Sequence, residues 1–376
     1  MKSIILILFV FFLTFYGCQE KKNTGSSISS ENIMQYAEGI AIYKHEGYSV
    51  VKVSNPWPNA NSNYTYILRE KIATIPDSLL RFPTIVIPIN RIITTSTTHI
   101  PALEMLSVEN SLVGFPGTDY ISSEKVRSRI DAGKVRNLGI SQNLNTEVVI
   151  ELQPDVIIAH GIDNNNPTLD NLQKSGLKVI VNGDWNEQSP LGKAEWIKLY
   201  GALYGKTSEA NKLFISIEKS YNNTLELAKK ATSRPTVISG AIFANNWYLP
   251  QGKSWASLLI HDAGGNYLWH DTKGTGSLSL PFESVYEKGK NAEFWIGPGQ
   301  FTSFDEMADA NIHYTQFAAF TKKKIFSYSI KKGKTGGIIY YELSQNRPDL
   351  LLKDFVKILH PELLPEYQLY FYQKLN

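Results

Sequence analysis

From residue 91 onward, short apolar runs alternate with segments whose apolar residues recur every three or four positions. Residues 155–159, which are apolar after the first position, are typical of a buried parallel strand. Residues 169–175 predict a helix that Gly176 ends, and residues 177–181 predict the next strand. The further strands expected from this pattern are residues 91–95, 111–115, 236–243, 247–249, 292–296 and 324–328. Strands that alternate with helices predict parallel sheets covered on both faces.

A long helical stretch separates two such α/β regions. Ser189 can cap its start with Pro190 at the first helical position, and Gly205 interrupts it. A second helix, capped by Thr207 or Ser208, is expected to run to about Ala231. Its apolar residues form one stripe, namely Leu213, Phe214, Ile217, Tyr221, Leu225 and Ala228. Some 23 helical residues would span about 35 Å, enough to cross a domain.

Residues 36–90 precede the first α/β region. Residues 48–53 and 64–69 each have a strand pattern, and Pro56-Trp57-Pro58 with an Asn-rich turn lies between them. This arrangement predicts a β-hairpin. We expect the hairpin to be a solvated addition, or else a cover for a sheet edge or a contact surface for another component.

The N-terminus carries an apolar stretch from Ile4 to Tyr16 after the basic Lys2. Thirteen helical residues span only about 20 Å, too short for the ~30 Å core of a bilayer, so a secretory signal is favoured over a membrane span. Gly17-Cys18 resembles a bacterial lipoprotein cleavage site, in which the cysteine becomes the lipidated first residue. A secreted protein with an unmodified Cys18 is the alternative. Residues 19–35 then predict a polar tether.

Composition excludes several classes of site. Cys18 is the only cysteine among 376 residues, so neither an intramolecular disulfide nor a cysteine metal cluster can form. The net charge of +3 does not favour a nucleic-acid partner. The chain has no Gly-x-Ser-x-Gly and no His-Glu-x-x-His motif, and its seven histidines are scattered. We therefore expect no catalytic residue and no metal-ligand set.

Several local patterns, in their order and spacing, resemble one family. They are Arg91 to Ser96, Leu112 to Phe115, Asn145-Thr146-Glu147 followed by Leu152 to Ile158, Tyr200 to Lys206, and Asp262 to Asn266. Together with the lipoprotein signal, they resemble the helical-linker class of ABC-transporter substrate-binding proteins over about residues 91–359. That class captures iron–siderophore complexes, cobalamin or haem.

The resemblance implies an α/β protein of two Rossmann-like lobes joined by a long helix. The expected organisation is a signal peptide (1–18), a tether (19–35), the hairpin extension (36–90), an N-terminal lobe (91–188), a helical linker (189–233) and a C-terminal lobe (234–376). In this family one surface glutamate on each lobe meets an arginine pocket of the permease. Glu147 and Glu283 match those positions. Each would also sit in the first turn of a helix, where negative charge favours the helix dipole.

The resemblance also implies a ligand cleft between the lobes, lined by loops at strand ends. The residues expected to line it are Thr98, His99, Tyr120, Trp247, Tyr248, Trp269 and Tyr340. Flat aromatic faces suit a macrocycle or a catecholate. Burial in the core is the alternative for Trp247, and His99 or His270 could serve as an axial ligand to haem or cobalt.

The function expected from the sequence is a periplasmic, membrane-anchored lipoprotein that performs no catalysis. It would bind an iron(III)–siderophore complex or cobalamin, with haem third, and deliver it to the permease of an ABC importer. It needs no cofactor of its own and no nucleic acid. A surface-exposed capture lipoprotein working with an outer-membrane receptor is one alternative. A haem-binding or chelatase-like α/β protein is the other.

Overall fold

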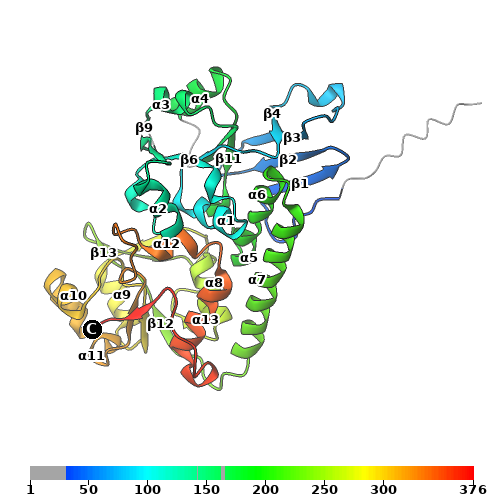
Figure 1. Cartoon of the computed structure of the whole chain (residues 1–376). Coiled ribbons are helices and arrows are strands. Elements are labelled where there is room, and N and C mark those ends of the chain that lie inside the picture. Colours follow the sequence, from blue (N-terminus) through cyan, green and yellow to red (C-terminus); the bar gives the residue numbers. More distant parts are fainter. Residues whose placement is uncertain (1–30, 142, 162–165) are drawn as a thin grey trace, which may run out of the picture.

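The computed structural model describes residues 31–141, 143–161 and 166–376. The expected signal peptide, Cys18 and most of the expected tether lie outside these ranges. Two α/β lobes are joined by a helical linker, and a third, smaller sheet lies at the N-terminus (Figure 1). The fold class expected from the sequence is confirmed.

The sheet of the N-terminal lobe is entirely parallel, in the order β11-β10-β5-β6-β7. Its strands are β5 (Ile92–Thr94), β6 (Leu112–Phe115), β7 (Arg136–Asn137), β10 (Val156–His160) and β11 (Val179–Asn182). Its helices are α1 (Ile100–Met105), α2 (Glu124–Asp131), α3 (Thr146–Glu151) and α4 (Pro167–Lys174), and β8 (Gly139–Ile140) pairs with β9 (Asn143–Leu144). The chain reverses its direction of winding between β5 and β10, so the carboxyl ends of these strands form the crevice where such sheets bind ligands.

The C-terminal lobe has a second sheet, in the order β15-β12-β17-β18-β19, in which only β19 is antiparallel. The strands are β12 (Thr236–Ile238), β15 (Asn266–Tyr267), β17 (Phe294–Ile296), β18 (Ile325–Ser327) and β19 (Gln373–Lys374). An antiparallel sheet of β13 (Ala241–Phe243), β14 (Asn246–Pro250) and β16 (Ser277–Leu280) lies beside it. The helices are α8 (Trp255–Asp262), α9 (Phe282–Gly289), α10 (Phe304–Ala310), α11 (Ala318–Thr321), α12 (Ile339–Leu343) and α13 (Pro348–Leu359).

The single strand expected over residues 236–243 is wrong, because the chain turns within it. Gly240 has φ of +79° and separates β12 from β13, which belong to different sheets. A Cβ at Gly240 would lie 1.8 Å from the carbonyl oxygen of Tyr248. Only glycine permits both this backbone conformation and this close approach.

The linker consists of α5 (Pro190–Glu195), α6 (Ile197–Leu203) and α7 (Thr207–Ala228). The Ser189 cap is confirmed, because its hydroxyl accepts from the N–H of Gly192. The cap expected for the second helix is wrong, since Lys206 takes that position without a side-chain hydrogen bond. Within α7, Phe214 and Ile217 belong to the core of the N-terminal lobe, whereas Tyr221 and Ala228 belong to that of the C-terminal lobe.

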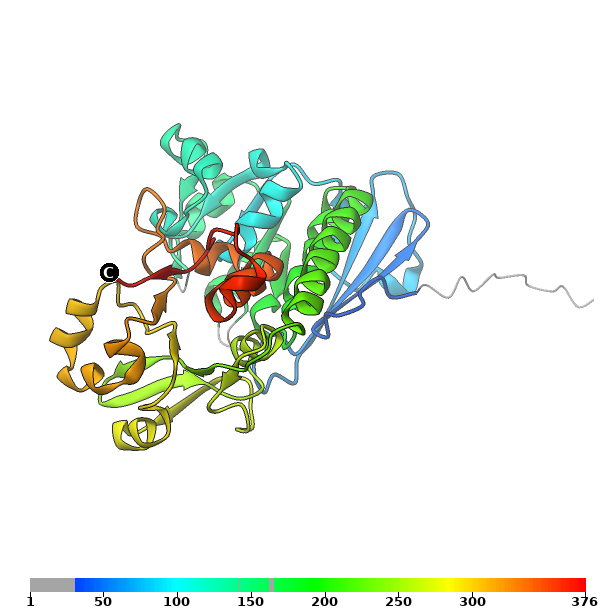
Figure 2. The ribbon, with the colours of Figure 1, turned by 90° about the horizontal axis from the view of Figure 1, so that it is seen from below.

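The N-terminal extension contains the expected hairpin, β2 (Tyr48–Ser54) with β3 (Asn63–Glu70), but it is larger than the sequence indicated. β1 (Ile40–His45) pairs with β2, and β4 (Thr84–Ile87) runs parallel to β3, which gives a four-stranded sheet. Its inner face shares the core of the N-terminal lobe with the linker. Figure 2 shows the linker helices between this sheet and α13. The extension is therefore an integral layer, and the expectation of a solvated addition is wrong.

Two buried carboxylates hold the segment before β1 onto the linker. Glu195 accepts hydrogen bonds from the backbone N–H groups of residues 35–37 and pairs with Lys198 at 2.6 Å. Glu187 accepts from the N–H groups of Glu38 and Gly39 and from the Trp196 indole. Each carboxylate replaces lost hydration with several donors, which is what makes burial of a charge tolerable.

A third buried carboxylate joins the lobes. Glu342 of α12 accepts from the backbone N–H groups of Ser122 and Ser123, at 2.5 and 3.0 Å, just before α2. The Asn346 amide donates to the carbonyl of Thr98 at 2.8 Å. Burial raises the pKa of Glu342 to about 7. The lobes are thus in direct polar contact as well as joined through the linker.

Replacing Glu195 by alanine should lower the free energy of unfolding by about 3 kcal/mol, because Lys198 is left buried without its partner. The matched control is Glu226→Ala, which removes an exposed pair with Lys229 on α7. That change should cost less than about 0.5 kcal/mol. Urea unfolding followed by tryptophan fluorescence measures both values. Equal losses would show that the Glu195 contacts contribute little.

The contribution of Glu342 to stability should fall as the pH rises through the window between about 4.5 and about 7. In that window the folded state keeps the proton on Glu342 that the unfolded chain has lost. Glu342→Gln should reduce the loss between pH 5 and pH 8 by up to ~3 kcal/mol. Glu342 lines a cavity between the lobes. The other charged groups of this cavity are unchanged in the variant, namely Glu104, Glu124, Arg127, Asp131, Lys332 and Lys334. Parallel pH profiles for the parent and the variant would refute this assignment.

Candidate functional site

A cleft of about 1000 Å³ lies between the C-terminal lobe, the linker and one edge of the N-terminal lobe. On the N-terminal side it is lined by Trp185 to Gln188, which follow β11, and by Pro58 from the loop between β2 and β3. The Trp185 indole donates to the carbonyl of Gly161 at 2.7 Å, which fixes the ring at the wall. The C-terminal lobe supplies most of the remaining surface.

That surface is rich in aromatic rings. Tyr328 and Tyr340 stack with ring centroids 4.4 Å apart, and the Tyr341 hydroxyl donates to that of Tyr328. Tyr248 and Tyr341 keep 40% and 46% of their surface exposed. Burial raises the pKa of Tyr328 and of Tyr340. These phenols therefore stay protonated and offer the ligand neutral, flat faces and hydroxyl groups.

The described lining of the cleft carries little charge. Among the described residues, its charged lining side chains are Glu187 and Lys193. The Lys193 ammonium donates to the carbonyls of Asp184 and Trp185 and lies over the Trp255 ring, 5.4 Å from its centroid. Burial lowers the pKa of Lys193 to about 8. Since Glu187 and Lys193 balance each other, the cleft favours a ligand of low net charge.

Of the residues that the sequence placed in the cleft, Tyr248 and Tyr340 line it. Trp247 and Trp269 lie in the core instead, with 0% and 4% of their surface exposed. Trp247 stacks on Trp295 and donates its indole N–H to the carbonyl of Ser239. Neighbouring residues of a strand point to opposite faces, so Trp247 and Tyr248 cannot both face the cleft.

Thr98, His99 and Tyr120 are absent from the described lining of the cleft. Thr98 and His99 are buried in the turn between β5 and α1, and Tyr120 is 72% exposed. The backbone of Tyr120 packs against Gly337, in a direct contact between the lobes. His270 lines a different cavity and hydrogen-bonds through Nδ1 to the carbonyl of Tyr267. On the N-terminal lobe, the cleft is therefore lined by residues that follow β11, and not by the residues after β5 that the sequence analysis predicted.

Sequence reasoning missed Trp185, Trp255, Tyr328 and Tyr341 in the cleft. Trp185 lies in the segment just after the strand predicted over residues 177–181, and that place at a strand end was the signal that could have found it. The other three come from separate elements whose faces the sequence does not orient.

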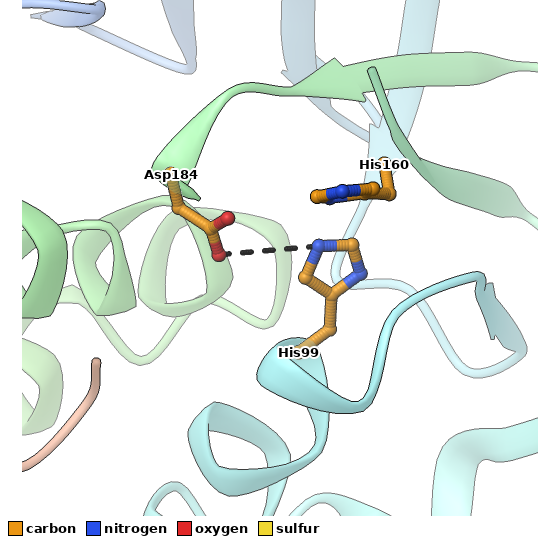
Figure 3. Close-up of side chains that lie close together, drawn as sticks. All are labelled: His99, His160 and Asp184. Atoms are coloured by element: carbon orange, nitrogen blue, oxygen red, sulfur yellow. Dashed lines mark ion pairs between the residues drawn. The ribbon is translucent and has the colours of Figure 1, made fainter. Parts of the chain in front are cut away.

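Sequence reasoning also missed a cluster of His99, His160 and Asp184, whose ligand-type atoms all lie within 4.8 Å of one another. Figure 3 shows the three side chains turned toward one another. His99 Nε2 lies 3.9 Å from Asp184 Oδ2. Burial lowers the pKa of both histidines and raises the pKa of Asp184 to about 6. The imidazoles are therefore neutral at neutral pH, the form that can accept a proton or bind a metal.

Glu147 and Glu283 are exposed in the first turns of α3 and α9, one helix in each lobe (Figure 1). Neither forms an ion pair with any of the described residues. Both carboxylates are thus available to a partner. None of the helices in the described part of the chain combines the length and apolar character needed to cross a bilayer.

Comparison with known proteins gives relatives that cover most of the chain. The uncharacterized lipoprotein MJ0878 of Methanocaldococcus jannaschii is 26% identical over 383 aligned positions, covering 95% of this chain and 89% of that protein. A possible iron-binding, periplasmic solute-binding protein of Staphylococcus epidermidis ATCC 12228 has a similar fold, with TM-score 0.57 and 19% identity over 73% of this chain and 99% of that one. The periplasmic haem-binding protein HutB of Vibrio cholerae gives TM-score 0.57 and 16% identity, over 72% and 99%.

The family model described as periplasmic binding protein matches residues 92–329, which include the N-terminal lobe, the linker and the larger part of the C-terminal lobe. That match covers more than half of the chain and agrees with the fold of the solved structures. The chain therefore belongs to the periplasmic binding protein family, whose members bind solutes and are not enzymes.

Proposed function

We propose that this protein is the lipid-anchored substrate-binding component of an ABC importer, and that its cleft binds a metal chelate of low net charge. A ferric siderophore without excess negative charge and cobalamin are the two ligands that fit this description. The observation that carries the proposal is the cleft itself, about 1000 Å³ lined by several tyrosine and tryptophan rings with one glutamate and one lysine. Aromatic faces bind flat or bulky organic ligands through area burial and stacking.

The balance of charge distinguishes between classes of chelate. A ferric tris-catecholate or a haem with ionised propionates would need cations in the cleft. Lys193 is the one cation among the described lining residues, and its ammonium is already engaged by two carbonyls. Placing a strongly anionic ligand there would leave charge unpaired in a partly desolvated site, which is costly. A neutral chelate leaves no unpaired charge in the cleft, so its binding does not carry this energetic penalty.

The names of related proteins support a lipid anchor and a metal-containing cargo, although not the choice between chelates. MJ0878 is named a lipoprotein, and of two proteins of similar fold one is described as a possible iron-binding protein and the other as haem-binding. By analogy with MJ0878, we propose that Cys18 is lipidated. By analogy with the other two proteins, we propose that the cargo contains a metal. Delivery would use Glu147 and Glu283, because two exposed carboxylates on separate lobes can engage arginine groups of a permease.

Intrinsic tryptophan fluorescence should be quenched on titration with cobalamin or a neutral ferric hydroxamate, and far less with a ferric tris-catecholate or haemin. Tyr248→Ala should weaken binding of the preferred chelate by about 1–2 kcal/mol, roughly 5- to 30-fold, because it removes a half-exposed ring from the cleft. Tyr120→Ala is the matched control. It removes an exposed tyrosine of the N-terminal lobe that does not line the cleft, and should leave affinity unchanged.

Tighter binding of the tris-catecholate than of every neutral chelate would contradict the charge argument. Equal losses from Tyr248→Ala and Tyr120→Ala would mean that ligand binds outside this cleft. The melting temperature of each variant, measured without ligand, separates an effect on binding from an effect on folding.

The double variant Glu147→Ala/Glu283→Ala should abolish uptake of the chelate by cells while leaving affinity in the cleft unchanged, because both carboxylates lie on the outer surface. The matched control is Glu209→Ala/Glu226→Ala, which removes two exposed glutamates from α7. Uptake of labelled chelate and fluorescence titration are measured on the same variants. A fall in affinity equal to the fall in uptake, or an equal fall in the control, would rule out docking through these residues.

A further inference from the structure

His99, His160 and Asp184 come from three adjacent strands of one parallel sheet. His160 is the last residue of β10, His99 follows β5 in the next turn, and Asp184 follows β11 by two residues. All three therefore lie at the carboxyl ends of the strands, and β5 and β10 flank the point where the strand order reverses. Figure 3 shows their side chains meeting from three directions.

The polar atoms of this cluster are buried and lack partners. His99 has no exposed surface, and neither of its ring nitrogens has a hydrogen-bond partner in the described part of the chain. Asp184 Oδ1 and His160 Nδ1 are likewise without one among the described residues. An unsatisfied buried polar atom costs about 1–3 kcal/mol, and most proteins contain few of them. Four such atoms in one place indicate a group that belongs between them.

The surroundings hold Asp184 in place and leave one oxygen of its carboxylate, Oδ1, without a hydrogen-bond partner among the described residues. The backbone N–H of Asp184 donates to Asn182 Oδ1 at 2.8 Å, and the Lys193 ammonium donates to the backbone carbonyl of Asp184 rather than to its side chain. Asn182 is in turn hydrogen-bonded to the Tyr200 hydroxyl. Burial raises the pKa of Asp184 to about 6, and the Lys193 ammonium, the Trp185 backbone and the Thr98 side chain limit this rise. The loop is therefore fixed by contacts that leave a carboxylate oxygen free.

We propose that His99, His160 and Asp184 bind a divalent transition-metal ion of the Zn²⁺, Co²⁺ or Ni²⁺ type. Two imidazole nitrogens and one carboxylate oxygen suit these borderline ions, whereas Mg²⁺ and Ca²⁺ prefer oxygen ligands alone. Around such an ion, bonds of about 2.0–2.2 Å place tetrahedral ligand atoms roughly 3.4 Å apart. His99 Nε2 and Asp184 Oδ2 are 3.9 Å apart, so small side-chain rotations bring them to that spacing. Three protein ligands leave one position open.

The site is separate from the cleft that takes the cargo. Its three residues are absent from the described cleft lining. The site is nevertheless close to the cleft, because the ring centroid of Trp185, which lines the cleft, is 5.8 Å from the ring centroid of His160. An ion here would sit behind the cleft wall and fix the loop that carries Trp185. The inference does not depend on which chelate the cleft binds, so either proposal can fail alone.

The test uses the full chain without a histidine tag, stripped with EDTA and titrated with Zn²⁺ and Co²⁺. We expect one equivalent of either ion to bind, a visible Co²⁺ absorption band typical of low coordination number, and a higher melting temperature with metal than without it. His160→Gln and Asp184→Asn should each weaken Zn²⁺ binding at least 100-fold in competition with a chromophoric chelator. His261→Gln, which removes an exposed histidine of the C-terminal lobe, is the matched control and should bind like the parent.

Two results would overturn the proposal. One is a parent protein that binds no Zn²⁺ or Co²⁺ stoichiometrically, in which case the cluster is a core group satisfied by buried water. The other is stoichiometric binding that survives both substitutions. Circular dichroism of each metal-free variant establishes that it is folded. Because His160 is only partly buried and both substitutions nearly preserve side-chain size, at least one variant should remain testable if the other unfolds.

Discussion

The α7 helix determines the architecture, because its single apolar stripe is shared by two hydrophobic cores. Phe214 and Ile217 are buried with the N-terminal lobe and its extra sheet, and Tyr221 and Ala228 with the C-terminal lobe. The Tyr221 hydroxyl also donates to Asp262 at 2.5 Å, which ties the helix to the end of α8. Moving the lobes apart would expose part of this stripe or break the helix. The width of the gap between the lobes is thus set by packing on one continuous helix.

Three buried carboxylates supplement this packing at two junctions. Glu195 and Glu187 hold the segment before β1, and Glu342 holds the N-terminal end of α2. In each case backbone N–H groups supply the donors, so the contact fixes the course of the chain and not only a side chain. Such directional contacts specify one relative placement of elements, which nonpolar burial alone specifies less sharply.

Both candidate sites lie where the rules of parallel sheets place ligands. The cleft uses residues that follow β11 together with loops of the C-terminal lobe, and the histidine–aspartate cluster uses residues that follow β5, β10 and β11. Strand ends are suitable because the strands hold the backbone rigid while the side chains beyond them are free to vary. Trp185 and Asp184 are neighbours in the chain and serve the two sites separately, one at the cleft wall and one behind it.

The sequence by itself determined the alternation of strands and helices, the two lobes, the long linker, the Ser189 cap and the strand ends at which a site could form. These features follow from local periodicity and capping chemistry, which act over a few residues. Only the tertiary structure decided which face each side chain occupies. Trp247 lies in the core and Tyr248 lines the cleft, because the side chains of adjacent strand residues point to opposite faces of the sheet. Likewise His99, His160 and Asp184, far apart in the chain, meet only because their strands are neighbours in the sheet, and strand order is set by long-range packing that local patterns do not encode.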